Sequence, residues 1–303
     1  MPKVSIIVNC FNGEKYLKQA LDSIYRQTYR DWEIIFWDNC STDKSAIIAN
    51  SYDDKLRYFL GSKNICLGAA RALATKEASG HWLAFLDVDD FWYENKLEIQ
   101  ISAINGKDVA LCYGGVEEVD AHSKILRKKI PKYFYGDMLA KQLNQFDINM
   151  VTPLINKSYL IKYEINFNPL ITASEEYNLF IRVLAKGNGL SIDKILGAYR
   201  TGENSLTNRQ ISEWEKERVY TLEQVQNENP GIYYDYKDGF DEAYCRSKYY
   251  RARYLMSIED KWAANKVLYN IALKSKKYFI LYIFSFSKIA WDLLHSDYIK
   301  RSL

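Results

Sequence analysis

Residues 83–90 read LAFLDVDD, an apolar run that passes directly into three aspartates, Asp87, Asp89 and Asp90. The apolar part is typical of a buried strand, and in an extended chain Asp87 and Asp89 project to the same side. Two carboxylates on one side suit a hard divalent cation, Mg2+ or Mn2+, which also binds phosphate oxygens. Taken alone, a D-x-D is common, and a solvated acidic turn that caps the following helix is the simpler interpretation.

Short apolar runs alternate with helical patterns on both sides of this stretch. In the pattern 14–27, Leu17, Ala20, Leu21 and Ile24 recur at helical spacing, so one helix face packs on a sheet. The alternation predicts a mainly parallel, Rossmann-like sheet flanked by helices. The runs and the helices that follow them are VSIIV (4–8) and 14–27, WEIIFW (32–37) and 43–52, LRYFL (56–60) and 67–79, HWLAFLD (81–87) and 92–104, and finally VALCY (109–113).

Polar residues gather where three of these runs end, which is where the ligand crevice of such a sheet lies. Asp38 ends a buried run, so its carboxylate could accept a base N–H or a ribose hydroxyl, or could make a structural hydrogen bond instead. Ser41, Thr42 and Asp43 offer caps for the next helix. The clusters are Asn9, Phe11 and Asn12; Asp38, Asn39, Ser41, Thr42 and Asp43; and Asp87, Asp89 and Asp90.

Four motifs occur together in a fixed order: NCFNGEKYLKQALDSIYRQTY (9–29), DNCSTDKS (38–45), NICLGAARALA (64–74) and DVDD (87–90). Their joint occurrence resembles the opening half of a family 2 glycosyltransferase with the GT-A nucleotide-sugar fold. That family usually has Pro or Thr where Asn9 stands, and Asp-Gly where Asn39 and Cys40 stand. The resemblance covers residues 1–208, densely to residue 104 and sparsely between 109 and 171.

The resemblance assigns most of the crevice residues to nucleotide binding. It implies that Phe11 flanks the base, with Asn12 in the same site, that Asp38 binds uracil and Asp87 the ribose, and that Asp89 binds the metal and thereby the diphosphate. The family also places Arg71 in the nucleotide site, where a guanidinium suits phosphate or ribose oxygens. An exposed cation lying along its helix is an equal alternative for Arg71.

Residues 171–187, ITASEEYNLFIRVLAKG, place an acidic pair at the start of an amphipathic helix. Acidic residues favour helix N-termini in any case. The segment also resembles the Glu-Asp motif that supplies the catalytic base of the family. On that resemblance Glu176 is the base, and Glu175 is a supporting residue or the alternative base. Glutamate stands here in place of the usual aspartate, which changes the reach of the carboxylate.

Residues 198–209, AYRTGENSLTNR, are similar to a family loop in which a histidine helps to hold the metal. Gly202 occupies the histidine position, so water, Glu203 or Asn204 substitutes there, or metal binding is weaker. Arg200 and Ser205 are candidate contacts for the diphosphate or a closing loop. A simple connector is the alternative.

Composition narrows the remaining classes of function. In 303 residues, 41 Lys and Arg against 38 Asp and Glu give a net charge of only +3, so nucleic acid is not expected as a partner. Five scattered cysteines and three isolated histidines predict neither a zinc site nor a Ser/His/Asp triad. The single glycine of NCFNGEK excludes the G-x-G-x-x-G turn of a dinucleotide-binding oxidoreductase.

The sequence after residue 208 is helical and electrically polarised. Residues 210–245 hold nine acids and three bases, net −6, whereas residues 246–303 hold four acids and twelve bases, net +8. The basic, aromatic stretch 274–301 could lie on an anionic membrane surface, or could pack as an ordinary helix or oligomer contact, with Tyr282, Phe286 and Ile289 as a core-facing stripe. Residues 278–294 fall short of a membrane span. The protein is therefore expected to be cytoplasmic, with possible peripheral contact at the inner membrane face.

Together these features predict an α/β protein with a GT-A domain over residues 1–208 and a C-terminal helical region over residues 209–303. The expected activity is transfer of a sugar from a nucleotide-sugar donor, a UDP-sugar by resemblance, to a hydroxyl of a glycan or lipid-linked acceptor. Direct displacement assisted by Mg2+ or Mn2+ would invert the anomeric carbon. The alternative is a GT-A nucleotide-binding or scaffolding module that has lost transfer, because Gly202 and Glu176 depart from the family pattern.

Overall fold

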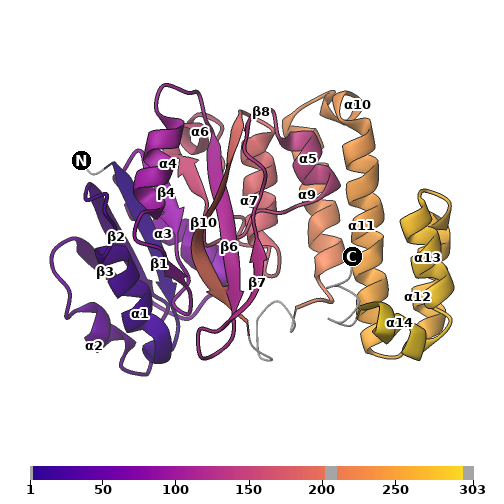
Figure 1. Cartoon of the computed structure of the whole chain (residues 1–303), viewed down its shortest axis with the longest axis horizontal. Helices are drawn as coiled ribbons and strands as arrows, with labels where there is room; N and C mark the ends of the chain where they lie inside the picture. Colours follow the sequence, from indigo (N-terminus) through magenta and orange to yellow (C-terminus); the bar gives the residue numbers. More distant parts are fainter. Residues whose placement is uncertain (1–2, 202–209, 296–303) are drawn as a thin grey trace. The chain divides into compact units, whose positions relative to one another are not determined.

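The computed structural model describes residues 3–201 and 210–295, and the chain divides into two compact units (Figure 1). The first unit comprises residues 1–142 and 146–205, and the second comprises residues 143–145 and 206–303. The predicted boundary between residues 208 and 209 lies outside the described residues.

The first unit is built on a sheet of ten strands. They are β1 (Val4–Cys10), β2 (Trp32–Asp38), β3 (Leu56–Leu60), β4 (Trp82–Phe85), β5 (Phe91–Trp92), β6 (Leu111–Val119), β7 (Ile125–Lys129), β8 (Phe134–Gly136), β9 (Leu154–Asn156) and β10 (Gly189–Arg200). Their order is β3-β2-β1-β4-β9-β6-β10-β5, with β7 on β6 and β8 on β10. Strands β3, β2, β1 and β4 are parallel, as are β6 and β10, which confirms the predicted mainly parallel sheet. The short strands β5, β7, β8 and β9 pair antiparallel.

Helices cover this sheet, and the first of them follows the predicted pattern. The helices are α1 (Glu14–Tyr25), α2 (Ser45–Ala49), α3 (Leu67–Glu77), α4 (Lys96–Ile104), α5 (Leu139–Asn144), α6 (Lys157–Lys162) and α7 (Glu175–Leu184). Leu17, Ala20, Leu21 and Ile24 of α1 are buried in one core with alternate residues of β1. All seven residues of β1 are buried, because α3 also packs against β1 and β2. The covered strands therefore bring their carboxyl ends together along one edge, which we call the carboxyl edge.

The second unit is helical, as predicted for the C-terminal region. Its helices are α9 (Trp214–Glu228), α10 (Ile232–Asp235), α11 (Lys237–Ser257), α12 (Lys261–Ala272), α13 (Lys276–Phe284) and α14 (Lys288–His295). Helix α11 packs against α9 and α12, and α12 packs against α13. Its own core includes Ala252, Met256, Leu268, Tyr278 and Trp291. In the part of the chain that the structure describes, no helix has both the length and the hydropathy needed to cross a bilayer.

Candidate functional site

The loops after β1 and β2 are joined to each other at the carboxyl edge. Asn12 has a φ of 53°, its backbone N–H donates to the Ser41 hydroxyl, and its side-chain oxygen accepts from the Thr42 N–H at 2.8 Å. Asp43 caps two helices, because its carboxylate accepts the N–H of Glu14 and of Ser45, each at 2.9 Å. Phe11 lies in the same pair of loops with its ring half exposed. Asp43 therefore performs the helix-capping role expected of this cluster. The ring of Phe11 is exposed enough to contact a ligand.

Asp38 lies at the end of β2 and is almost completely buried. One carboxylate oxygen accepts the Ser41 N–H at 2.7 Å, and the other accepts the Tyr58 hydroxyl at 2.6 Å. Both carboxylate oxygens thus accept structural hydrogen bonds, as the alternative to ligand binding predicted. Each oxygen keeps a second lone pair, so these bonds orient the carboxylate without using all of its accepting capacity.

The turn after Asp38 accommodates Asn39 and Cys40, the two residues that depart from the family pattern. Cys40 has a φ of 66°, a left-handed conformation that glycine adopts most readily. Its thiol lies against the Gly61 carbonyl oxygen at 3.1 Å. The Asn39 side chain donates to the Ile65 carbonyl at 2.7 Å and accepts the Ile65 N–H at 3.2 Å. Asn39 therefore fixes the approach to α3, the helix that carries Arg71.

The three aspartates of residues 87–90 lie in a turn and not on an extended strand. Strand β4 ends at Phe85, and the Asp90 N–H donates to the Asp87 carbonyl at 3.1 Å. The expectation that Asp87 and Asp89 project together from an extended chain is therefore wrong. The turn sends the Asp87 side chain to Arg71, leaves Asp89 exposed and buries Asp90.

Arg71 connects the turn at 87–90 with the start of α7. The residue is only 3% exposed, so the structure excludes the alternative of a surface cation. Its guanidinium donates to Asp87 at 2.5 Å and to Glu175 at 2.7 Å. The side chain also lies 5.9 Å from the centre of the Phe167 ring. A planar cation with two carboxylate partners holds both acids in fixed directions.

The acidic pair at the N-terminus of α7 divides into one buried and one partly exposed carboxylate. Glu175 is buried, and burial raises its pKa to about 8, with the negative charge of Glu176 adding to the increase and Arg71 opposing it. Glu176 is partly exposed at the first turn of the same helix. The raised pKa favours a protonated Glu175 at neutral pH, and Glu176 is the more exposed of the two carboxylates.

Arg200 lies at the end of β10 and is engaged by the protein itself. Its guanidinium donates to the carbonyls of Asp89 at 3.0 Å and Asp120 at 2.7 Å, and to the side chain of Gln19 at 3.0 Å. Its backbone N–H donates to the Asp90 carboxylate at 2.8 Å. In this arrangement Arg200 fixes the backbone of the aspartate turn. The loop residues Gly202, Glu203, Asn204 and Ser205, which the sequence also singled out, lie outside the described residues.

The aspartate turn suits a divalent cation, such as Mg2+, that binds through only one or two protein carboxylates. Among residues 3–201 and 210–295, no three or more His, Cys, Asp or Glu side chains gather closely enough to hold a metal ion. Restricted hydration raises the pKa of Asp89 although its residue is exposed, and the charge of Asp87 adds to this effect. The pKa of the buried Asp90 carboxyl is raised for the same reasons. This surplus of negative charge would favour a cation, and Mg2+ commonly binds through one or two carboxylates together with phosphate and water oxygens.

Several residues that shape this edge carry no signal in the sequence. Tyr58 looks like an ordinary strand residue, yet it holds Asp38. Gln19 lies on α1 and contacts Arg200. Asp120 and Ser123 lie in the turn that follows β6, a segment without any motif, and they contact Arg200 as well. These contacts depend on which loops the topology brings together, so neither spacing nor residue type could have revealed them.

A comparison with known families and proteins agrees with this geometry. The model of Glycosyl transferase family 2 matches residues 5–163. The chain is 28% identical over 235 residues to an Escherichia coli protein named UDP-Glc:alpha-D-GlcNAc-diphosphoundecaprenol beta-1,3-glucosyltransferase WfgD, covering 76% of this chain and 90% of that protein.

Two solved structures share the fold at low sequence identity. The first is S. aureus TarS 1-349 in complex with UDP-GlcNAc, with a TM-score of 0.71 and 16% identity over 98% of this chain and 92% of that one. The second is the mannosyltransferase PcManGT from Pyrobaculum calidifontis in complex with GDP-Man and Mn2+. Its TM-score is 0.60 at 14% identity, and the match covers 97% of this chain and 86% of that one.

Proposed function

The chain belongs to glycosyl transferase family 2, and on that premise we propose that it transfers a sugar from a UDP-sugar to a hydroxyl of a lipid-linked or glycan acceptor, with inversion. The UDP-sugar donor is supported by the name of the Escherichia coli relative and by the UDP-GlcNAc complex of TarS. The same relative's name contains a sugar linked to diphosphoundecaprenol, which supports an acceptor of that class.

The observation that carries this proposal is the bridge made by Arg71. It joins Asp87, in the turn proposed to hold the donor, to Glu175, which precedes the proposed base Glu176. A transferase must hold the leaving group and the attacking hydroxyl in a fixed relation, and a bridging guanidinium provides one between the two halves of the site.

Glu176 is the proposed catalytic base, and Glu175 the residue that positions it. The Glu175 carboxyl is buried, bonded to Arg71 and protonated at neutral pH, so it is poorly placed to take a proton from an acceptor. Glu176 is partly exposed in the first turn of the same helix. It would remove the proton of the acceptor hydroxyl as that oxygen attacks the anomeric carbon from the face opposite the diphosphate.

The remaining residues are proposed to bind the donor. Phe11 would lie against the base, with Asn12 in the loop beside it. The oriented carboxylate of Asp38 would accept a uracil N–H. Asp87 would accept a ribose hydroxyl, and Arg71, next to it, would favour the anionic part of the donor.

Asp89 is the proposed metal ligand, with Arg200 holding its backbone in place. A bound Mg2+ or Mn2+ there would offset the negative charge of the departing diphosphate. The PcManGT complex, which contains Mn2+, supports a divalent cation for this fold. Because the guanidinium of Arg200 already donates to four protein groups, we propose that it serves the donor site through the aspartate turn.

The test separates donor binding from transfer. Binding of UDP, with Mn2+ and with EDTA, is measured by calorimetry on the wild type, Asp89→Ala and Glu176→Gln, together with turnover of UDP-sugars. We expect Asp89→Ala to lose the metal-dependent part of UDP binding. We expect Glu176→Gln to bind UDP normally and to lose roughly 10²–10⁴-fold in turnover, the range of a general base.

Two exposed acids on other loops provide matched controls. Asp54→Ala and Glu164→Gln remove the same charges away from the carboxyl edge and should leave both properties unchanged. Equal activity of Asp89→Ala, Glu176→Gln and the wild type would contradict the site. Metal-dependent UDP binding without turnover on any acceptor would instead support the scaffolding alternative.

A further inference from the structure

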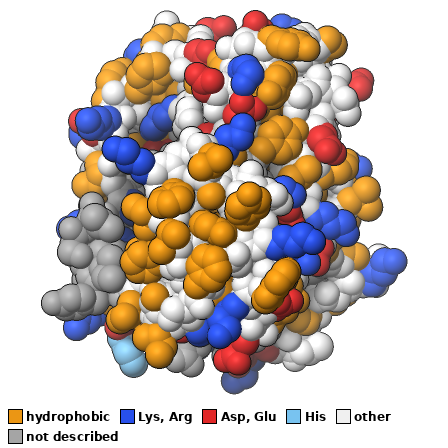
Figure 2. Space-filling view, turned by 90° about the vertical axis from the view of Figure 1, so that its right-hand side faces the viewer, with side chains coloured by type: hydrophobic (Ala, Val, Ile, Leu, Met, Phe, Trp, Pro, Cys, Tyr) orange, Lys and Arg blue, Asp and Glu red, His pale blue; other side chains and the backbone are white. Residues whose placement is uncertain are grey.

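Helices α12, α13 and α14 present large apolar side chains to solvent. We call six of these residues the apolar face. Figure 2 shows orange side chains gathered on the face that α12, α13 and α14 form, with Lys and Arg side chains and some Asp and Glu side chains at its margin. The six residues are Leu273, Phe279, Ile280, Ile283, Phe286 and Ile289, which are between 47% and 94% exposed.

The inner side of α13 is apolar as well. Tyr278 and Leu281 are buried against the core of the second unit, whereas Phe279, Ile280 and Ile283 point away from that core. The core-facing stripe expected from the sequence is therefore wrong in part. Tyr282 packs against the core, but Phe286 and Ile289 are exposed. A helix that is apolar on both sides usually has both sides covered, so the outer side lacks its cover here.

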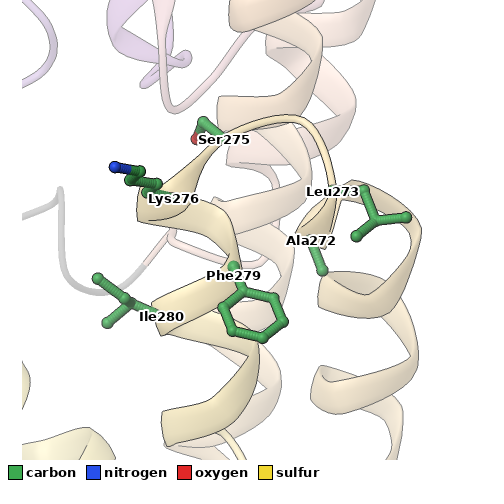
Figure 3. Close-up of a pocket in the computed structure, with 6 residues that line it drawn as sticks. All are labelled: Ala272, Leu273, Ser275, Lys276, Phe279 and Ile280. Atoms are coloured by element: carbon green, nitrogen blue, oxygen red, sulfur yellow. The ribbon is translucent and has the colours of Figure 1, made fainter.

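The surface between α12 and α13 is hollowed. A shallow groove of about 420 Å³ lies there, with the Leu273 and Phe279 side chains projecting at it and Lys276 near its end (Figure 3). Its lining residues are Ala272, Leu273, Ser275, Lys276, Phe279 and Ile280. The groove offers mainly carbon atoms, and a flexible acyl chain is better suited to fill it than a rigid polar ligand.

Positive charge surrounds the apolar face. Residues 261–295 contain six lysines and one acid, Asp292, a net charge of +5. Lys288 pairs with Asp292 and Lys277 with Glu242. The other four, Lys261, Lys266, Lys274 and Lys276, are exposed. The surface therefore combines apolar side chains with cations, the two features that bind a helix to an anionic bilayer surface.

We propose that the apolar face and its lysines dock on the surface of a membrane rich in anionic lipid. The three helices would lie in the interface, with their apolar side chains among the acyl chains and their lysines at the phosphate groups. A second copy of the chain is less suited to cover the apolar face. A twofold contact would bring two surfaces of net charge +5 together, and they would repel each other. The argument rests on the second unit alone and does not depend on the proposed transfer reaction.

The test measures binding of the full chain to vesicles by co-sedimentation. One vesicle preparation is phosphatidylcholine, and the other contains phosphatidylcholine and phosphatidylglycerol in equal parts. We expect the wild type to bind the anionic vesicles at least about tenfold more tightly and to release them as salt is raised. We expect Phe279→Gln/Ile283→Gln and Lys266→Glu/Lys276→Glu each to weaken that binding by about tenfold or more.

Matched variants on the first unit act as controls. Ile47→Gln/Ile161→Gln replaces two apolar helix residues that are more exposed than Phe279 and Ile283, and Lys76→Glu reverses an exposed charge on α3. All three changes should leave vesicle binding unaltered. The salt dependence of the wild type provides a readout that needs no variant.

Two outcomes would overturn the proposal. One is wild-type binding that does not distinguish anionic from neutral vesicles. The other is a concentration-dependent dimer in analytical ultracentrifugation that Phe279→Gln/Ile283→Gln dissociates, without vesicle binding by the wild type. The second result would assign the apolar face to a second copy of the chain.

Discussion

At Glu175, opposing effects act on one carboxyl group. Burial and the neighbouring Glu176 raise its pKa to about 8 from an ordinary value of 4.5, while Arg71 favours the charged form. The folded protein therefore keeps a proton on Glu175 at pH values where the unfolded chain has released it. Because the folded state binds more protons in this range, the free energy of unfolding falls as the pH rises from 4.5 to about 8.

Glu175→Gln should remove this contribution to the pH dependence. The amide keeps an oxygen for Arg71 and cannot ionise, so the variant should gain roughly 2–5 kcal/mol relative to the wild type between about pH 5 and about pH 9. Urea unfolding across this range measures the difference. Glu164→Gln, on an exposed loop, should follow the wild type. Curves for Glu175→Gln and the wild type that stay parallel would show that Glu175 is ionised throughout.

At the scale of the element, helix α4 begins with a buried lysine. Lys96 is fully buried, its ammonium donates to Gln100 at 2.7 Å, and it lies 4.0 Å from the centre of the Trp92 ring. Burial lowers its pKa to about 7 from 10.5. The unfolded chain binds this proton between those values and the folded chain does not, so this lysine makes stability rise with pH from about 7 to 10.5.

Lys96→Met should therefore stabilise the protein most at or below about pH 7, by about 2 kcal/mol after the loss of the Gln100 hydrogen bond. The gain should shrink as the pH approaches 10.5, where both states of the wild type lose the proton. Guanidinium unfolding near each pH provides the comparison. Lys107→Met, just beyond the same helix, is the exposed control. A variant that is destabilised equally at both pH values would contradict this account.

The same scale shows which elements the sequence can predict. Strands β1, β2 and β4 appear as apolar runs because both faces are covered, and α1 appears through its periodic apolar face. The edge strand β3 also has an apolar sequence, although only Leu56 of its five residues is buried. The three-residue β8 and β9 carry no comparable pattern, because such short strands are held by their partners β10, β4 and β6. Among the site residues, Asp38 and Glu175 could be placed by motif. The burial of Arg71 could not, because it requires Asp87 and Glu175 to meet across the fold.

At the scale of the whole molecule, each compact unit has a buried apolar cluster, and among the residues that the structure describes these two clusters share no residue. One joins β1, β2 and α1, and the other joins α11–α14. A unit with its own core can unfold as a unit, so calorimetry should resolve two transitions. UDP with Mn2+, at about a hundredfold excess over Kd, should raise the transition of the first unit by roughly 5–10 °C and leave the other in place. A single transition that shifts as one would show that the units unfold together.

The proton on Glu175 also has a kinetic consequence. An anionic donor approaching the carboxyl edge meets the field of Asp87, Asp89 and Glu176, and a neutral Glu175 leaves Arg71 less fully neutralised. The long-range field at the carboxyl edge, which affects how often the charged donor meets its site, is then less repulsive to an anion than it would be with an ionised Glu175. The association rate of the donor should therefore slow as the pH rises past about 8, and added salt should reduce that slowing.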